Sequence, residues 1–194
     1  DGRVTDIVPN LRGLVGQGRV GWADAATIIP WQHYMAYGDR TILEEQWESM
    51  KAWVDYVISQ SPGYLWNTGW HYGDWLFYSV NNDNAGNSAV TYTPLVQQCF
   101  FANSATIMSK AAEVLGKEKD AAYYADVARK VKEAFCENYL TPAGMLVSST
   151  QTAYVLALNF DMLPENMRSK AAAHLAANVE KYGHITTGFL GTPY

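Results

Sequence analysis

Two short blocks of this 194-residue chain place aromatic side chains beside carboxylate and imidazole groups. The residues of these blocks that could form one site are Trp22, Asp24, His71, Tyr72, Asp74 and Trp75. An indole offers a flat, electron-rich face that packs on the C–H face of a sugar ring, and a nearby carboxylate accepts hydrogen bonds from sugar hydroxyls. The two blocks therefore indicate a site that holds carbohydrate.

All seven tryptophans lie in the first half of the chain, and the sequence divides them by context. Trp47 and Trp53 fall on the apolar stripe of a predicted helix, so we expect them in the core. Trp31 is also assigned to packing. Trp66 and Trp70 lie in a predicted loop, where they could contact sugar or anchor the loop.

Composition bounds the class of protein. With 48% apolar residues, 13% aromatics and a net charge of -5, the chain is predicted to be one globular domain without a nucleic-acid partner. Cys99 and Cys136 stand at no metal or redox spacing, so neither a disulfide, a metal site nor a cofactor is expected. No apolar run is long enough to predict a membrane span. The chain opens on Asp1, so the lack of a targeting segment says nothing about compartment.

The 3.6-residue periodicity predicts six helices, at 24–37, 41–59, 94–115, 118–139, 149–160 and 165–182. Gly38, Gly116 and Gly183 follow three of them as helix stops. Thr93 is predicted to cap the third helix, with Pro94 in its first turn. No segment alternates convincingly enough to predict a sheet.

The predicted helices are of two kinds that alternate along the chain. The segments 25–37, 94–109 and 149–160 lack Asp, Glu, Lys and Arg, so we expect them to be covered on nearly every side. The second, fourth and sixth helices are amphipathic, as Leu43 and Glu44 illustrate. The sequence thus predicts three hairpins, each pairing an inner helix with an outer one.

Alternating inner and outer helices describe either a solenoid or a closed toroid. The three hairpins share no residue signature at a fixed period, which favours the toroid. The predicted fold class is therefore all-α, an (α/α)6 toroid of which about half is present as three hairpins. Residues 1–194 are expected to be part of a single domain truncated at both ends, or to need a partner that covers the open flanks.

The connections between hairpins hold the unusual residues. The stretch 61–92 is much longer than a usual helix connection, and loops of that length are commonly functional. The segment 81–88 has strong turn chemistry. The loop 140–148 and the tail 184–194 are expected on the same side of the molecule, if the helices stay in register.

Several blocks together resemble the catalytic domain of bacterial α-L-rhamnosidases, glycoside hydrolase family 78. They are spread from one end of the chain to the other: Asp1-Gly2-Arg3-Val4-Thr5-Asp6-Ile7-Val8-Pro9, Gly21-Trp22-Ala23-Asp24-Ala25-Ala26, Tyr37-Gly38-Asp39, Met50-Lys51-Ala52-Trp53-Val54-Asp55-Tyr56, His71-Tyr72-Gly73-Asp74-Trp75-Leu76, Thr150-Gln151-Thr152-Ala153-Tyr154 and Thr186-Thr187-Gly188-Phe189-Leu190-Gly191-Thr192-Pro193-Tyr194. The resemblance implies an (α/α)6 toroid that removes terminal α-L-rhamnose with inversion of configuration. It also implies a rhamnose-containing carbohydrate as substrate and the remainder of a longer chain to close the toroid.

The resemblance also shows what this chain lacks. The family's general acid lies in an Asp-Glu-Arg-x-Gly-Trp-x-Gly-Asp type motif upstream of the block at 21–26, and its general base in a Trp-Glu type motif downstream of residue 194. Neither motif occurs at its family position within this chain. Because an inverting hydrolase needs both carboxyl groups, we expect no catalytic residue within the chain and no turnover by the chain alone.

By the resemblance, Trp22 and Trp75 are the expected aromatic walls of the sugar pocket. Asp24 and Asp74 are the expected hydroxyl acceptors, with the neighbouring histidine and tyrosine close by. A carboxyl group buried near indole rings is a candidate for a raised pKa. His71 is favoured over the two helical histidines.

Other interpretations remain open. Asp24 and Asp74 could instead cap helices. In a complete chain the same two residues would be the obvious acid and base. A non-catalytic helical module that binds oligosaccharide, and another toroidal hydrolase acting on a different sugar, are the two competing functions. His33 and His174 are assigned to ordinary packing or surface positions.

Overall fold

The computed structural model describes residues 1–11, 16–77 and 90–194, and the turn predicted at 81–88 lies outside this part. Its α-helices are α1 (Ala25–Tyr37), α2 (Thr41–Ser59), α3 (Thr93–Val114), α4 (Glu118–Tyr139), α5 (Gln151–Asn159) and α6 (Glu165–Tyr182). A short 3-10 turn, η2 (Pro62–Tyr64), follows α2. In these ranges the only β pairing is two isolated bridges. The expected all-α fold is confirmed.

Helix ends follow the predicted chemistry closely. The bounds of α2, α4 and α6 are those predicted, and the other three differ by one or two residues. Gly38 and Gly183 are left-handed and donate their N–H groups back to Tyr34 and Val179. The capping prediction for Thr93 is wrong, because Thr93 is already the first helical residue and no side chain caps α3 there.

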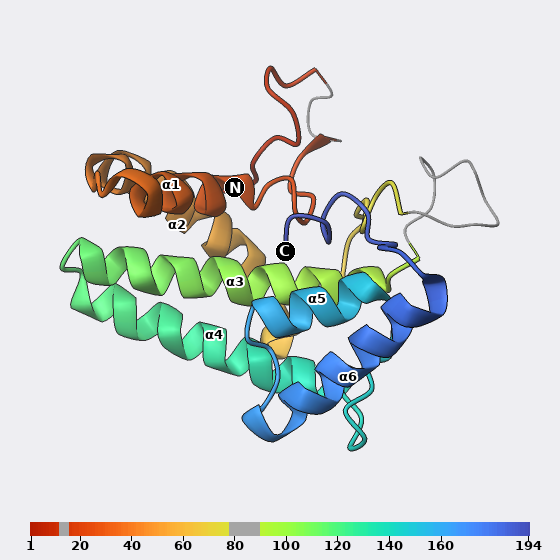
Figure 1. The fold of residues 1–194 in the computed structure, drawn as a ribbon. Helices are drawn as coiled ribbons and strands as arrows, with labels where there is room; N and C mark the ends of the chain where they lie inside the picture. Colours follow the sequence, from red (N-terminus) through yellow and green to blue (C-terminus); the bar gives the residue numbers. More distant parts are fainter. Residues whose placement is uncertain (12–15, 78–89) are drawn as a thin grey trace.

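The helices pair as three hairpins, α1 with α2, α3 with α4 and α5 with α6 (Figure 1). Helix α3 also contacts α1 on one side and α5 on the other, so these three form an inner row. Among the described residues, the backbones of the outer helices α2, α4 and α6 do not approach one another closely, and α2 and α4 are joined by a hydrogen bond from the hydroxyl of Tyr124 to the carboxylate of Asp55, at 2.8 Å. The predicted alternation of inner and outer helices is therefore confirmed.

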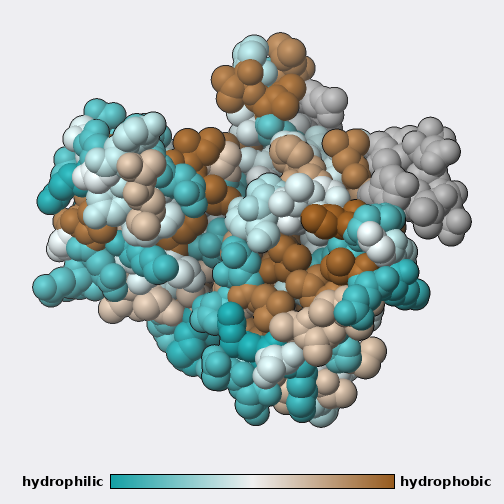
Figure 2. All heavy atoms as spheres, in the orientation of Figure 1, coloured by the Kyte–Doolittle hydropathy of each residue, from teal (hydrophilic) through white to brown (hydrophobic). Residues whose placement is uncertain are grey.

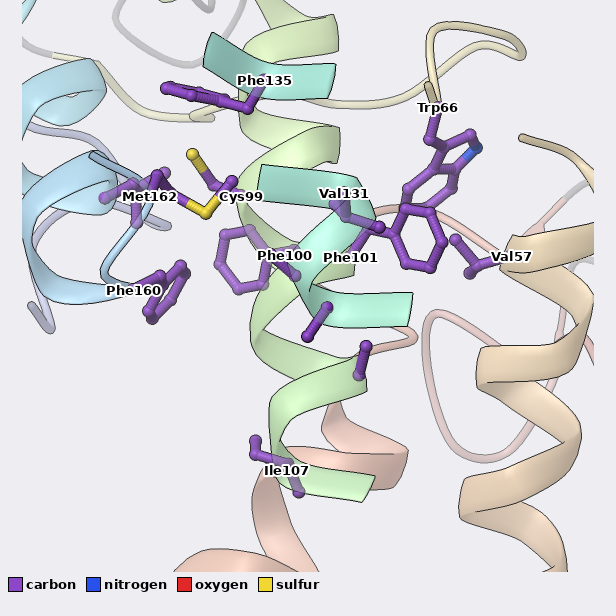
Figure 3. Close-up of a cluster of buried hydrophobic side chains, with 14 of the residues drawn as sticks. Val57, Trp66, Cys99, Phe100, Phe101, Ile107, Val131, Phe135, Phe160 and Met162 are labelled. Atoms are coloured by element: carbon purple, nitrogen blue, oxygen red, sulfur yellow. The ribbon is translucent and has the colours of Figure 1, made fainter. Parts of the chain in front are cut away.

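Helix α3 is the centre of the hydrophobic core because it is buried on both flanks. Phe100 points toward α5 and lies 5.3 Å from the ring of Phe160 (Figure 3). Its neighbour Phe101 points the other way, toward Trp66 and Val57. Both phenylalanines are 1% exposed. Burying such side chains stabilises the fold by roughly 1.5–3 kcal/mol each. Because the two rings point to opposite flanks, α3 packs against both the α1–α2 hairpin and the α5–α6 hairpin.

Helix α1 departs from the expectation for inner helices. Only Thr27 and Pro30 are buried in it, while Ile29 and Met35 are more than half exposed. The prediction that this helix is covered on nearly every side is wrong for this chain, because α2 and α3 are the only helices of the described ranges that pack against it. Figure 2 shows hydrophobic atoms gathered in the middle of this face, between the α1–α2 hairpin and α6.

The connections that follow the outer helices meet at one end of the molecule. The hydroxyls of Thr91 and Thr150 lie 2.7 Å apart, which joins the α2–α3 and α4–α5 connections. The amide of Gln151 donates to the carbonyl of His184 and accepts from the N–H of Thr186, which adds the tail. The expected common side of these loops is confirmed. None of the helices in the described ranges is long and apolar enough to cross a bilayer.

Candidate functional site

Three of the predicted side chains converge although they come from loops far apart in the sequence. The ring of Tyr72 lies 4.7 Å from that of Trp22 and 5.5 Å from that of Trp75, with the latter pair nearly perpendicular at 89°. Together with Asp6 and Ile7 they line a cavity of about 250 Å³, which we call the aromatic pocket. All three rings are partly exposed, so their faces are available to a ligand.

Asp6 is a member of the aromatic pocket that the sequence did not single out. Its carboxylate accepts a hydrogen bond from the hydroxyl of Tyr72, at 3.1 Å, and another from the N–H of Arg19, at 3.2 Å. A carboxylate held in this way still has lone pairs for a sugar hydroxyl. In the sequence, Asp6 is marked only by its place in the block 1–9 that resembles the rhamnosidase family, because no local pattern points to it.

Phe189 extends the aromatic surface from the C-terminal tail. Its ring lies 5.2 Å from that of Trp22, and its N–H donates to the carbonyl of Trp75 at 2.6 Å. The side chain is 54% exposed. The tail therefore brings a further aromatic ring beside the pocket, a role that a lone phenylalanine in an irregular segment could not reveal by pattern.

Asp74 holds that tail in place. Its fully buried carboxylate accepts hydrogen bonds from the hydroxyl of Thr152 and from the N–H groups of Gly188, Leu190 and Gly191. The tail passes so close that a Cβ on Gly188 would lie 2.4 Å from the carbonyl oxygen of Trp75. Only glycine fits such an approach. Asp74 thus joins its own loop to α5 and to the tail, and caps no helix.

Asp24 is a second buried carboxylate whose hydrogen bonds join separate segments of the chain. It is fully buried, and its carboxylate accepts from the N–H of Gly21 at 2.8 Å, the indole of Trp53 at 3.0 Å and the hydroxyl of Ser104 at 2.7 Å. Burial raises its pKa, and these three donors oppose the rise. Although it directly precedes α1, its side chain makes no capping bond. It joins the α1 entry loop to α2 and α3.

These buried carboxylates bear on the acid and base alternative. A general acid or base must come within hydrogen-bonding reach of its substrate. Neither Asp24 nor Asp74 exposes any surface, and every bond given above runs to another part of the chain. The geometry therefore argues against these two residues as a catalytic pair.

His71 is fixed by both ring nitrogens. Its Nδ1 accepts from the N–H of Val20 at 3.0 Å, so the proton is on Nε2, which donates to the carbonyl of Thr68 at 3.1 Å. Burial lowers its pKa to about 4. The ring therefore stays neutral near neutral pH and links the loop before Trp22 to the loop before Trp75.

The remaining tryptophans separate as their contexts suggested. Trp47 and Trp53 are buried at 4% and 0% exposure, which confirms their place in the core, and Trp31 packs partly buried against it. Trp66 is 2% exposed and meets the ring of His71 edge-on at 5.0 Å, so it anchors its loop. Trp70 is 61% exposed, with the guanidinium of Arg19 5.1 Å from its ring.

The other candidate groups lie away from the aromatic pocket. His33 is exposed beside the ring of Tyr37, and His174 stacks on Tyr154 at 5.8 Å. Cys99 and Cys136 are free thiols. Within the described ranges no cluster of His, Cys, Asp and Glu has the geometry to hold a metal ion.

The described lining of the aromatic pocket has the chemistry expected of a sugar-binding site but not the two carboxyl groups expected of a hydrolytic one. Aromatic faces and one accessible carboxylate suit a ring with an apolar side and several hydroxyls. Hydrolysis with inversion requires two carboxyl groups about 6.5–9.5 Å apart across the bond. Of the described residues that line the cavity, Asp6 is the one acid.

The three hairpins of inner and outer helices belong to an all-α hairpin domain. The whole chain, residues 1–194, matches the family described as bacterial alpha-L-rhamnosidase 6 hairpin glycosidase domain, and it belongs to that family. The chain is 39% identical over its full length to an alpha-L-rhamnosidase of Streptomyces avermitilis, and 38% identical to one of Formosa agariphila.

A solved structure supports the same assignment. The crystal structure of the Streptomyces avermitilis alpha-L-rhamnosidase complexed with L-rhamnose matches the whole chain with a TM-score of 0.88 at 38% identity. The fold class predicted from the sequence, three hairpins of an (α/α)6 toroid, is thereby confirmed. The chain spans 18% and 21% of the lengths of the two relatives, and 18% of the solved chain.

Proposed function

We propose that this chain is the sugar-holding part of an inverting α-L-rhamnosidase, which hydrolyses terminal α-L-rhamnose from glycosides or polysaccharides. The single observation that carries the proposal is the aromatic pocket, within a chain that belongs to the rhamnosidase family along its entire length. The relative of known structure was solved with L-rhamnose, which supports this sugar as the ligand. No cofactor is required for the reaction proposed.

The pocket suits rhamnose for a physical reason. L-Rhamnose carries a C6 methyl group in place of a hydroxymethyl group, so it presents more apolar surface than most hexoses. The indoles of Trp22 and Trp75 gain by covering that surface, and the phenol of Tyr72 stands between them. The carboxylate of Asp6 is placed to accept from a hydroxyl on the polar side of the ring.

We propose two ways in which the six predicted residues serve binding. Trp22, Tyr72 and Trp75 contact the sugar directly. The other three hold those rings in position: Asp74 through the tail, Asp24 through the α1 entry loop, and His71 through its bonds to both pocket loops. Buried and fully bonded supports keep a binding site preorganised, which lowers the entropy lost when the ligand binds.

The general acid and the general base are proposed to lie elsewhere in a longer protein. The chain lacks both acidic motifs expected of the family, and its two fully buried pocket-side carboxylates cannot reach a glycosidic oxygen. We therefore propose that residues 1–194 are one part of a single (α/α)6 domain, and that the rest of the parent chain closes the toroid and supplies the general acid and base.

Hydrolysis of aryl glycosides tests this function. The full-length protein should release p-nitrophenol from p-nitrophenyl α-L-rhamnopyranoside but not from the corresponding β-D-glucoside, β-D-galactoside or α-L-arabinofuranoside. Proton NMR of the first product should show β-L-rhamnose, as inversion requires. Preferred cleavage of another sugar would contradict the assignment of the substrate, and binding without cleavage would favour a non-catalytic module.

The chain alone provides a second test. The purified 194-residue chain should give no measurable turnover of the same rhamnoside, because it lacks the acid and the base. Robust rhamnose release by that chain would refute the proposal that this chain binds the sugar while the catalytic acid and base lie in the rest of the protein.

A further inference from the structure

A second and larger cavity lies at the end of the molecule where the loops meet. Its volume is about 610 Å³, against about 250 Å³ for the aromatic pocket, and it shares no lining residue with that pocket. Its polar and aromatic walls come from Asn67, Tyr92, Asn138, Tyr139 and Ser148. We call it the rim cavity. Its volume falls within the roughly 300–1,000 Å³ of small-molecule sites.

The described residues that line the rim cavity are uncharged and rich in hydrogen-bonding groups. Within the described residues the hydroxyl of Tyr139 has no hydrogen-bond partner, although the side chain is only 5% exposed. The amide nitrogen of Asn138 donates to the carbonyl of Ala134, which leaves its oxygen as an acceptor. The hydroxyl of Ser148 accepts from the N–H of Tyr92, which leaves its proton to donate. Among the described residues, no acidic or basic side chain lines the cavity.

The walls are held by the fold and do not depend on a ligand. Buried Gln98 accepts from the N–H of Trp66 at 2.9 Å and so fixes the segment that precedes Asn67. The N–H of Tyr92 donates to Ser148 at 3.1 Å, and the ring of Tyr92 lies 6.1 Å from that of Tyr139. Burial raises the pKa of Tyr139 to about 12, so its hydroxyl can both donate and accept at neutral pH.

We propose that the rim cavity is a second carbohydrate-binding site, which takes an uncharged oligosaccharide chain and is separate from the aromatic pocket. Tyrosine rings provide faces for the C–H side of sugar rings, while amide and hydroxyl groups pair with sugar hydroxyls. The described lining residues offer no counterion to an acidic glycan. The larger volume suits a ligand longer than the one in the aromatic pocket. This inference holds whichever sugar the aromatic pocket takes.

Calorimetry with the full-length protein tests the proposal. The probes are three uncharged tetrasaccharides, cellotetraose, mannotetraose and xylotetraose, with tetragalacturonate as the charged counterpart. At least one uncharged probe should bind, and tetragalacturonate should bind more weakly than that probe. If no uncharged tetrasaccharide binds at millimolar concentration, or if the charged one binds best, the proposal is overturned.

Two variants locate the binding. Tyr92→Ala removes a half-exposed ring but keeps the backbone bond to Ser148, and it should weaken the tetrasaccharide about tenfold. Tyr139→Phe keeps the buried ring and removes only the hydroxyl, and it should weaken binding several-fold at an unchanged melting temperature. Tyr123→Ala, at an exposed tyrosine of α4, is the matched control and should change nothing. Unchanged affinity in both rim variants would overturn the proposal.

Kinetics of the same variants separate two sources of the oligosaccharide. A higher KM for a rhamnose-capped tetrasaccharide, with an unchanged KM for the aryl rhamnoside, would show that the substrate's own chain reaches the rim cavity. Weaker tetrasaccharide binding with both KM values unchanged would show that a separate chain binds there. Either result supports the site. Failure of rhamnoside hydrolysis would refute the proposed enzyme and leave the calorimetric result standing.

Discussion

Replacing Asp74 by Asn tests whether the tail is held by a buried carboxylate. The substitution keeps the shape but turns one acceptor oxygen into an NH2 group. Two of the four donors around the carboxylate, either Leu190 and Gly191 or Thr152 and Gly188, then face a donor. Hydrogen bonds to charged groups contribute about 1.5–3 kcal/mol each, so two lost bonds cost about 3 kcal/mol or more. Whole domains are stable by only roughly 5–15 kcal/mol.

Hydrogen exchange read by mass spectrometry measures this loss where it occurs. In full-length Asp74→Asn, a peptide covering 186–192 should exchange about a hundredfold faster, since each 1.4 kcal/mol is about tenfold. Asp126→Asn is the control, because that exposed carboxylate pairs with the surface cations Arg129 and Lys130 and its loss should leave the exchange of this peptide unchanged. Unchanged exchange in Asp74→Asn, together with lost rhamnose binding, would refute the positioning role and favour direct contact with the sugar.

Three further predictions concern single side chains. Trp75→Ala in the full-length protein should raise KM for the aryl rhamnoside about tenfold at near-normal stability, and unchanged kinetics would remove Trp75 from the pocket. Trp53→Ala should lower the free energy of unfolding by about 3–5 kcal/mol in urea titrations, since it also removes the indole donor to Asp24, and a fully stable variant would contradict its core role. For His71 the pKa falls from 6.5 unfolded to about 4 folded, so its stabilisation is complete above 6.5 and is lost as pH drops toward about 4. That difference corresponds to about 3 kcal/mol, which His71→Gln should remove and exposed His33→Gln should retain in pH-dependent unfolding.

The helices could be predicted from the sequence because their signals are local. Apolar spacing predicted α2, α4 and α6 to the residue, and Gly183 marks the end of α6. The exposure of α1 could not be predicted in the same way, because a helix without charges shows only that its flanks are apolar. Whether those flanks are covered depends on which other elements pack against them, and among the described helices α2 and α3 alone do so.

The site could be predicted in part. Two tryptophan-containing blocks marked Trp22 and Trp75, and the structure brings them together around Tyr72. Residue type alone did not indicate that Asp24 is enclosed by protein donors, because a carboxylate beside an indole fits either a sugar ligand or a buried support. Phe189 could not be predicted, since its position depends on bonds between the tail and a loop more than a hundred residues earlier.

The hydrogen bonds between Asp74 and the tail position two aromatic rings at once. Asp74 lies one residue before Trp75, and Phe189 lies between the glycine and leucine whose N–H groups Asp74 accepts. The same carboxylate therefore sets the position of a pocket wall and of the ring that packs on Trp22. A buried charge is costly unless it is fully bonded, and here four donors offset the cost. Aromatic rings on long loops can thus be held in place by a buried, fully bonded carboxylate.

A crystal structure of the full-length protein with L-rhamnose tests the central claim most directly. We predict the sugar in van der Waals contact with the rings of Trp22, Tyr72 and Trp75, with its methyl group against an indole and a hydroxyl donating to Asp6. Asp24 and Asp74 should keep the protein hydrogen bonds described here. Rhamnose bound elsewhere, with these three rings free of ligand, would contradict the account.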